Sequence, residues 1–292
     1  MKQETPVTFV IPLYNQLKFI PECLQSIINQ TFTDWKSIVV DDQTPDGDAQ
    51  AVIDSLNDPR IVLVRHSSNK GLAAARNTGF RMARSPWIVP VDADDKLDSH
   101  FLKAMFETVQ KNLQTNVVVP DFYIFGTAEG IQTYPLKDER ASLIKQSIPG
   151  PGCFISRRLW EEAGGYCEHE VICHGNEDWE FWISAMEIGI KATLLHKPLY
   201  FYRRHETSMM TRQVFYEHIT RPFIYKKHKK TFKRYHAGRK FLFDGYYLSA
   251  VSYSRKKQKL MAASIGLKAL SCSPDWKSFK KTIRFFIGIV NQ

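Results

Sequence analysis

Short apolar runs alternate with segments of helical periodicity through the first half of the chain. Between the runs, residues 49–56, residues 71–82 and a stretch that contains Phe19 and Leu24 place apolar residues on one helical face. Continuous Val/Ile runs of this kind are typical of strands that are buried on both faces, so the pattern predicts a mostly parallel sheet flanked by helices. The apolar runs are VTFVI (residues 7–11), SIVV (37–40), IVLV (61–64) and WIVPV (87–91).

The second half of the chain has a mixed pattern and then becomes helical. A strand-like VVVPDFYIF follows residue 116, a helix is expected near 177–188, and two strands are expected near 191–195 and 198–204. From about residue 211 the periodicity is helical. We therefore expect two domains, an α/β domain over residues 1–210 and a helical region over residues 211–292.

Charge is distributed unevenly between these parts. The net charge is +10, but residues 203–292 hold 21 Lys+Arg against 4 Asp+Glu, or +17, which leaves residues 1–202 at −7. A difference of this size suggests that the two parts have different tasks. Five irregularly spaced cysteines give no disulfide framework, and the N-terminal segment has no leader pattern, so we expect a cytoplasmic protein.

Two acidic clusters come directly after apolar runs. Asp41 and Asp42 come after the second run, and Asp92, Asp94 and Asp95 come after the fourth. Ligands of parallel sheets bind beyond the carboxyl ends of the strands. Carboxylates one residue apart suit one divalent cation, and Mg²⁺ or Mn²⁺ prefers such oxygen ligands together with phosphate. An isolated D-x-D is more often a solvated turn, so its position after a strand is the reason that a metal site is the better interpretation.

Seven segments in order give the chain a specific resemblance over about residues 6–210. The chain resembles a family 2 glycosyltransferase of the GT-A fold, a Rossmann-like nucleotide-diphospho-sugar transferase. That resemblance implies an inverting, metal-dependent transfer of a sugar, preferably from a UDP-sugar, to a saccharide or lipid-linked acceptor. The segments are VTFVIPLYN, SIINQTF, IVVDDQTPDGD, NKGLAAARNTGF, WIVPVDADDKL, NEDWEFW and YRRHETSMM.

The resemblance implies a base pocket at the end of the first strand. Pro12 and Tyr14 would frame the base, with the Tyr14 ring as a stacking face. Asp42 would accept a hydrogen bond from a base N–H, which favours uracil, and Asp41 would assist. The alternative for Tyr14 is a core aromatic.

Further residues are implied at the diphosphate. Lys70, Gly71 and Arg76 lie at the start of a helix, which suits an anionic pyrophosphate. A surface salt bridge is the alternative for Arg76. The remaining donor residues implied by the resemblance are Asp92, Ala93, Asp94 and Arg204, and the implied ligands of Mn²⁺ or Mg²⁺ are Asp92, Asp94 and His205.

The segment Asn176-Glu177-Asp178-Trp179 matches the family's catalytic motif. Asp178 is implied as the base that takes the proton of the acceptor hydroxyl. Glu177 is the second candidate, and one of the pair is expected to position the acceptor. The alternative is that both are acids favoured at a helix N-terminus by the macrodipole. The expected acceptor residues are Gly152, Cys153, Glu177 and Trp179.

The final helix is amphipathic and basic. One interpretation is an interfacial helix on an anionic membrane, with the aromatic residues facing acyl chains. The alternative is a helix whose apolar stripe packs on the protein. A nucleic-acid-binding module would explain the basic region but not the acidic clusters, so no nucleic-acid partner is expected. A catalytically silent nucleotide-sugar-binding relative is a further alternative. The apolar residues are Trp276, Phe279, Ile283, Phe286, Ile287 and Val290, and the basic ones are Lys277, Lys280, Lys281 and Arg284.

Overall fold

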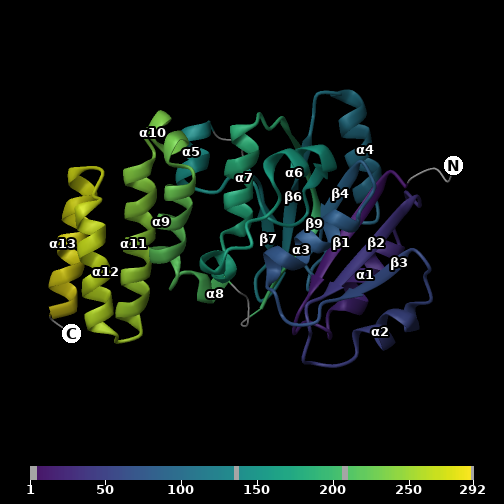
Figure 1. Cartoon of the computed structure of the whole chain (residues 1–292), viewed down its shortest axis with the longest axis horizontal. Helices are drawn as coiled ribbons and strands as arrows, with labels where there is room; N and C mark the ends of the chain where they lie inside the picture. Colours follow the sequence, from purple (N-terminus) through teal and green to yellow (C-terminus); the bar gives the residue numbers. More distant parts are fainter. Residues whose placement is uncertain (1–4, 135–137, 206–209, 291–292) are drawn as a thin grey trace. The chain divides into compact units, whose positions relative to one another are not determined.

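The computed structural model describes residues 5–134, 138–205 and 210–290 (Figure 1). The chain separates into two compact units, which we call the sheet unit and the helical unit. The predicted boundary at residue 210, between an α/β domain and a helical region, stays a prediction. The sheet unit contains Met1–Leu136, Ile148–Glu168 and Glu177–Glu206, and the helical unit contains Lys137–Ser147, His169–Asn176 and Thr207–Gln292.

One mixed sheet forms the centre of the sheet unit. Its strands lie in the order β3-β2-β1-β4-β8-β6-β9-β5, with β7 on β6. The pairs β1–β2, β1–β4, β2–β3 and β6–β9 are parallel, and the shorter pairs are antiparallel. The mostly parallel α/β fold is therefore confirmed. The strands are β1 (Val7–Leu13), β2 (Trp35–Asp41), β3 (Ile61–Arg65), β4 (Trp87–Pro90), β5 (Lys96–Leu97), β6 (Val117–Gly126), β7 (Gly130–Gln132), β8 (Phe154–Ser156) and β9 (Ala192–Arg204).

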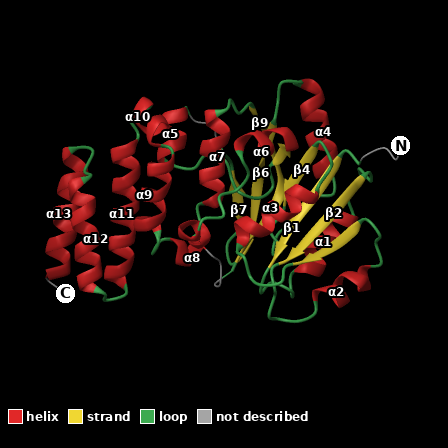
Figure 2. Cartoon of the chain, in the orientation of Figure 1, coloured by secondary structure: helices red, strands yellow, loops and turns green. Residues whose placement is uncertain are grey.

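Helices cover both faces of this sheet (Figure 2). On β1, Phe9 and Ile11 join the core under α1, α2 and α4, whereas Val10 joins the core under α3, α6 and α7. Because successive strand residues point to opposite faces, an uninterrupted apolar run serves both cores. The helices are α1 (Ile20–Ile28), α2 (Ala49–Leu56), α3 (Leu72–Met82), α4 (Phe101–Lys111), α6 (Arg157–Ala163) and α7 (Glu177–Glu187).

The two strands predicted near 191–195 and 198–204 are one strand, β9. Pro120 pairs with Leu195 and the next residue, Asp121, pairs with Pro198, so His196 and Lys197 are extra residues in β9. Such a bulge lets a strand continue through a proline, which has no N–H for the ladder. The sequence prediction failed here because the exposed His196-Lys197 pair interrupts the apolar pattern.

The helical unit is built from packed helices. Within it α11 packs against α9 and α12, and α12 packs against α13. In the described ranges, no helix is long and apolar enough to cross a membrane. The elements are α5 (Glu139–Ile144), the 3-10 helix η1 (Glu170–His174), α8 (Met210–Gln213), α9 (Glu217–Lys227), α10 (Lys229–Arg234), α11 (Gly238–Arg255), α12 (Lys259–Ser271) and α13 (Trp276–Val290).

The packing of α3 on β1 predicts a specific sensitivity at Gly79. A Cβ at Gly79 would lie 2.3 Å from Cγ1 of Val10, so Gly79→Ala forces the helix away from the strand. We expect a loss of about 1–3 kcal/mol in the free energy of unfolding, measured by urea denaturation. Gly288→Ala in α13 is the control, because no atom lies within 4 Å of that Cβ. An unchanged stability of Gly79→Ala would contradict this packing.

Candidate active site

The two acidic clusters occupy the predicted edge of the sheet. Asp41 ends β2 and Asp42 follows it, while Asp92 to Asp95 form a turn after β4. Since β2 and β4 lie on either side of β1 and run parallel to it, both clusters follow the carboxyl ends of neighbouring strands. Their placement agrees with the rule for ligand sites in such sheets.

Arg76 joins this edge to the start of α7. Its guanidinium donates from Nη2 to Oδ1 of Asp92 at 2.8 Å and from Nη1 to Oε1 of Glu177 at 2.6 Å. Only 2% of Arg76 is exposed, so a surface salt bridge is the wrong interpretation of this residue. Burial opposes the charged form, but the carboxylates of Asp92 and Glu177 outweigh it and raise the pKa of Arg76. The sequence assigned Arg76 to a pyrophosphate, and here its guanidinium bridges two carboxylates.

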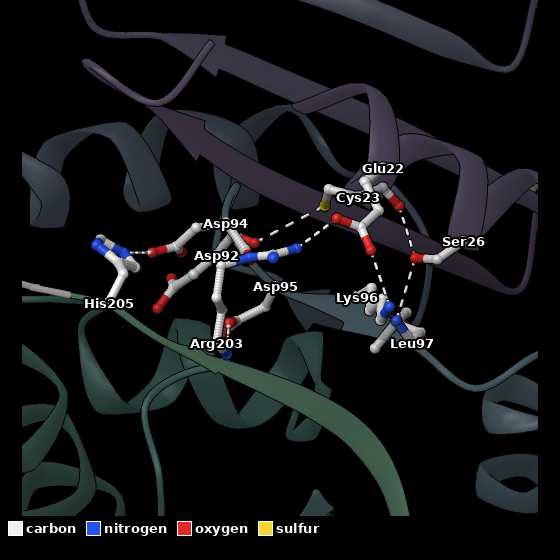
Figure 3. Close-up of polar contacts among 10 residues, drawn as sticks. All are labelled: Glu22, Cys23, Ser26, Asp92, Asp94, Asp95, Lys96, Leu97, Arg203 and His205. Atoms are coloured by element: carbon white, nitrogen blue, oxygen red, sulfur yellow. Dashed lines mark hydrogen bonds and ion pairs between the residues drawn. The ribbon is translucent and has the colours of Figure 1, made fainter. Parts of the chain in front are cut away.

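Residues of β9 hold the Asp92–Asp95 turn in place. Nε2 of His205 lies 2.8 Å from Oδ2 of Asp94. The buried Asp95 accepts hydrogen bonds from the Tyr200 hydroxyl at 2.6 Å and from the Arg203 N–H at 2.7 Å. Figure 3 shows the side chains of Asp94 and His205 directed toward each other. The turn therefore has a fixed shape, with Asp92 tied to α3 and Asp94 and Asp95 tied to β9.

An ion pair from α1 completes this support. Glu22 pairs with the guanidinium of Arg203, and its other oxygen lies 2.8 Å from Nζ of Lys96 (Figure 3). Sequence reasoning missed Glu22 and Tyr200, and it gave Asp95 no role. Glu22 and Arg203 are 181 positions apart, so no local pattern connects them.

The donor types at the turn fit a hard divalent cation. Burial and the charge of Asp92 raise the pKa of Asp94, and burial and the charge of Asp94 raise the pKa of Asp95. A cation beside these carboxylates would relieve both the desolvation and the repulsion. In the described part of the chain, however, no group of three or more His, Cys, Asp or Glu side chains is arranged to hold a metal.

The loop after β1 is braced by the segment DDQTPDGD (residues 41–48). The N–H of Asn15 donates to Oγ1 of Thr44 at 2.7 Å, and the N–H of Leu17 donates to Oδ2 of Asp46 at 2.8 Å. DDQTPDGD therefore fixes the loop that carries Tyr14. Tyr14 is 48% exposed, so it is not a core aromatic, whereas Pro12 is buried.

Asp42 holds the loop that leads into α3. Its carboxylate accepts hydrogen bonds from the N–H groups of Lys70 and Gly71, each at 2.8 Å, and Oδ1 lies 2.7 Å from Nδ1 of His66. Gly71 has a φ of +89°, which favours glycine. Asp42, Lys70 and Gly71 were all predicted to bind the sugar donor, and they lie together here. The side chain of Lys70 is exposed. The structure also gives Asp42 a structural role in the loop before α3 that the sequence interpretation lacked.

Asp41 has a different partner. Its carboxylate lies 2.7 Å from Nε of Arg65 on β3 and accepts a hydrogen bond from the N–H of Thr44 at 2.8 Å. Asp41 is 1% exposed, and it therefore anchors both the end of β3 and the DDQTPDGD segment.

Glu177 and Asp178 differ in their surroundings, although they are adjacent. Glu177 is 6% exposed and bound to Arg76; burial and the charge of Asp178 raise its pKa to about 7, against the effect of Arg76. Asp178 is half-buried under the Pro149–Gly152 loop, where a Cβ on Gly150 would lie 2.6 Å from its Oδ2. Only glycine allows the loop backbone to approach this carboxylate so closely.

The predicted acceptor residues divide between the loop and the core. Gly152 has a φ of +75°, and its Cα packs against the ring of Tyr200. Cys153 has 0% exposure and belongs to the core under α3, so its thiol is a core group in this structure. Trp179 is 5% exposed, and its backbone N–H donates to Oδ1 of Asp178 at 2.7 Å. Arg204 is exposed at the end of β9. Residues 206–209 of the YRRHETSMM segment lie outside the described residues.

Comparisons with known proteins point to one family. The family model "Glycosyl transferase family 2" matches residues 8–160. The uncharacterized glycosyltransferase EpsJ of Bacillus subtilis is 28% identical over 217 residues, 70% of this chain and 62% of the relative. The uncharacterized glycosyltransferase YibD of Escherichia coli is 26% identical over 72% of this chain and 64% of the relative. The chain thus spans under two thirds of the length of these relatives.

Solved structures share the fold. The crystal structure of S. aureus TarS 1-349 in complex with UDP-GlcNAc has a TM-score of 0.64 at 15% identity, over 97% of this chain and 91% of that one. The mannosyltransferase PcManGT from Pyrobaculum calidifontis, in complex with GDP-Man and Mn²⁺, has a TM-score of 0.61 at 16% identity, over 99% of this chain and 87% of that one. At these identities the likeness concerns the fold, and it confirms the GT-A architecture.

The bridging role of Arg76 predicts that lysine cannot replace it. A single ammonium does not reach both carboxylates in a fork geometry, so Arg76→Lys leaves a buried carboxylate unpaired. We expect a loss of about 3–5 kcal/mol in the free energy of unfolding. The control is Arg81→Lys, whose pair with Glu168 is solvent-exposed and whose expected effect is within about 0.5 kcal/mol. Equal effects of the two substitutions would refute the bridge.

The raised pKa of Glu177 predicts a pH-dependent stability. Between its ordinary value of about 4.3 and about 7, the folded state holds a proton that the unfolded state has lost, so stability falls as pH rises through this window and then levels off. Glu177→Gln removes this contribution. The difference in unfolding free energy between wild type and Glu177→Gln should therefore change by up to about 3 kcal/mol from pH 4 to 7.5. A difference that does not vary with pH would contradict the assignment.

Proposed function

Because the chain belongs to glycosyl transferase family 2, we propose that it transfers a sugar from a nucleotide diphosphate to a saccharide or lipid-linked acceptor, with inversion at the anomeric carbon. The observation that carries the proposal is the Arg76 bridge. It connects the Asp92–Asp95 turn, which suits a diphosphate and its metal, to the Glu177-Asp178 pair, which suits an acceptor hydroxyl.

The proposed donor is a nucleotide sugar, and a UDP-sugar is favoured. The bound UDP-GlcNAc of TarS and the bound GDP-Man of PcManGT support this donor class by fold likeness. In this chain the exposed ring of Tyr14 offers a stacking face for the base, beside Pro12. Carboxylate acceptors at Asp41 and Asp42 suit the N–H of uracil, although the oxygens of Asp42 already accept hydrogen bonds from Lys70 and Gly71.

We propose that Asp92, Asp94 and His205 would hold Mn²⁺ or Mg²⁺, which supplies positive charge beside the departing diphosphate. The protein's own part is to orient Asp92 through Arg76 and Asp94 through His205. Arg204, exposed at the end of β9, adds a cation that suits a diphosphate oxygen. The Mn²⁺ in the PcManGT complex is consistent with this requirement.

Asp178 is the proposed general base. Its half-buried carboxylate would accept the proton of the acceptor hydroxyl as that oxygen attacks the anomeric carbon. Attack from the face opposite the departing diphosphate inverts the configuration. Glu177, engaged by Arg76, would orient Asp178 and the acceptor rather than take the proton. Gly152 and the other loop residues near Asp178 would form part of the acceptor wall.

We also propose a peripheral position at the cytoplasmic face of a membrane, where a lipid-linked acceptor is reached from the donor's side. The +17 charge of residues 203–292 supports this placement, because anionic lipids attract basic segments.

Asp178→Asn tests the assignment most simply. It keeps the size of the side chain and removes the base, so transfer from a panel of nucleotide sugars with Mn²⁺ should fall on the order of 10²–10⁴-fold. Donor binding, followed by calorimetry, should change little. Asp34→Asn, an exposed site on the same unit, is the control and should keep full activity. Transfer that stays within tenfold of wild type in Asp178→Asn would exclude this residue as the base, and transfer unaffected by EDTA would exclude the metal.

A further inference from the structure

Helix α13 presents large apolar side chains outward and small polar side chains inward. Ser278 is 8% exposed and Thr282 is fully buried. By contrast, Trp276 is 64%, Ile283 38% and Ile287 56% exposed. An ordinary amphipathic helix of a folded protein buries its apolar face, so this arrangement needs an explanation.

The attachment of α13 to its neighbour uses other residues. The aromatic rings of Phe285 and Phe286 pack against Gly266 of α12, where a Cβ would lie 2.9 Å from the Phe286 ring. Phe286 therefore belongs to the packing face, contrary to its place in the predicted outward stripe, and the side chain of Val290 lies outside the described residues. The helix thus has one apolar face on the protein and a second one at the surface, and the membrane interpretation stays a prediction.

Four cations flank the outward stripe. The pocket beside it has a volume of about 650 Å³ and combines these cations with aromatic walls. Nζ of Lys281 lies 4.1 Å from the ring centre of Tyr247, and Nζ of Lys280 lies 5.3 Å from that of Trp276. Residues 276–290 contain no acidic residue to neutralise them. The pocket is lined by Tyr247, Trp276, Lys277, Lys280, Lys281, Arg284 and Phe285.

The positive charge and the exposed apolar side chains of the α13 face together indicate which kind of partner it binds. A second copy of the same face would place the four cations against themselves, which is repulsive. Nucleic acid offers phosphates but leaves Ile283 and Ile287 in water. An anionic bilayer offers phosphates at its surface and acyl chains below, which matches both features.

We propose that the α13 face binds an anionic phospholipid bilayer peripherally. Lipid phosphates occupy the pocket among Lys277, Lys280, Lys281 and Arg284, while Trp276, Ile283 and Ile287 enter the boundary between headgroups and acyl chains. The inference deepens the proposed peripheral membrane position by naming the surface that binds, and it does not depend on the proposed sugar transfer, because it rests on residues of the helical unit alone.

Vesicle binding by the full chain tests the charged part of the surface. Wild type should bind vesicles of phosphatidylcholine with phosphatidylglycerol and not vesicles of phosphatidylcholine alone. The variant Lys277→Gln/Lys280→Gln/Lys281→Gln should bind on the order of 100-fold more weakly, since each removes a contact to the anionic surface. The control variant Arg255→Gln/Lys256→Gln/Lys259→Gln removes the same charge at exposed positions outside α13 and should stay within about threefold of wild type.

Fluorescence tests the apolar part. Trp276 is exposed whereas Trp35, Trp160, Trp179 and Trp182 are buried, so lipids brominated in the acyl chains should quench wild-type fluorescence through Trp276. Trp276→Phe should keep binding within about threefold and lose that quenching. Transfer of sugar in solution should be unchanged in all these variants, which separates this test from that of the proposed function.

Three results would overturn the proposal. Wild type that fails to bind the anionic vesicles would leave an acidic protein partner as the better occupant. Equal losses of vesicle binding in the Lys277 and Arg255 triple variants would mean that only the net charge of the protein matters. Fluorescence quenching that persists in Trp276→Phe would mean that another face of the protein contacts the bilayer. Unchanged urea unfolding midpoints would confirm that each variant is folded.

Discussion

The candidate site depends on one buried cation, the guanidinium of Arg76. It holds Asp92 at 2.8 Å and Glu177 at 2.6 Å, and so connects the turn after β4 with the first turn of α7. Burial raises the pKa of Glu177, and the positive charge of Arg76 opposes that shift. A planar fork with two donor nitrogens is what allows one residue to serve both. This bridge therefore determines the position of Asp92 relative to Glu177.

A second level of support lies outside the site. Asp95, Tyr200 and Arg203 hold the acidic turn against β9, and Asp42 holds the start of α3 through the N–H groups of Lys70 and Gly71. Because α3 carries Arg76, the contacts of Asp42 with the loop before α3 also help to position the bridge. Sheet edge, helix start and acidic turn are therefore one connected polar network, and a change in any part is expected to be felt in the others.

Local pattern in the sequence predicted the strands and the edge of the sheet, but it could not predict pairings between distant residues. The Val/Ile runs located the edge at which Asp41 and Asp92 lie, since an apolar run ends where its strand does. The bridging of Arg76, the pair of Glu22 with Arg203 and the burial of Cys153 depend on residues far apart in the chain, so no spacing revealed them. In α13 the helical periodicity was predicted correctly, but periodicity alone does not show which apolar residues face the protein and which face outward.

The bridge is the central claim, and a double-mutant cycle on the free energy of unfolding tests it most directly. Asp92→Asn and Glu177→Gln each leave Arg76 one carboxylate, whereas the double variant leaves a buried cation with neither. We predict that the double variant loses at least about 1 kcal/mol more than the sum of the two single variants. Losses that add within about 0.5 kcal/mol would contradict the account, because they would mean that the two carboxylates do not share Arg76.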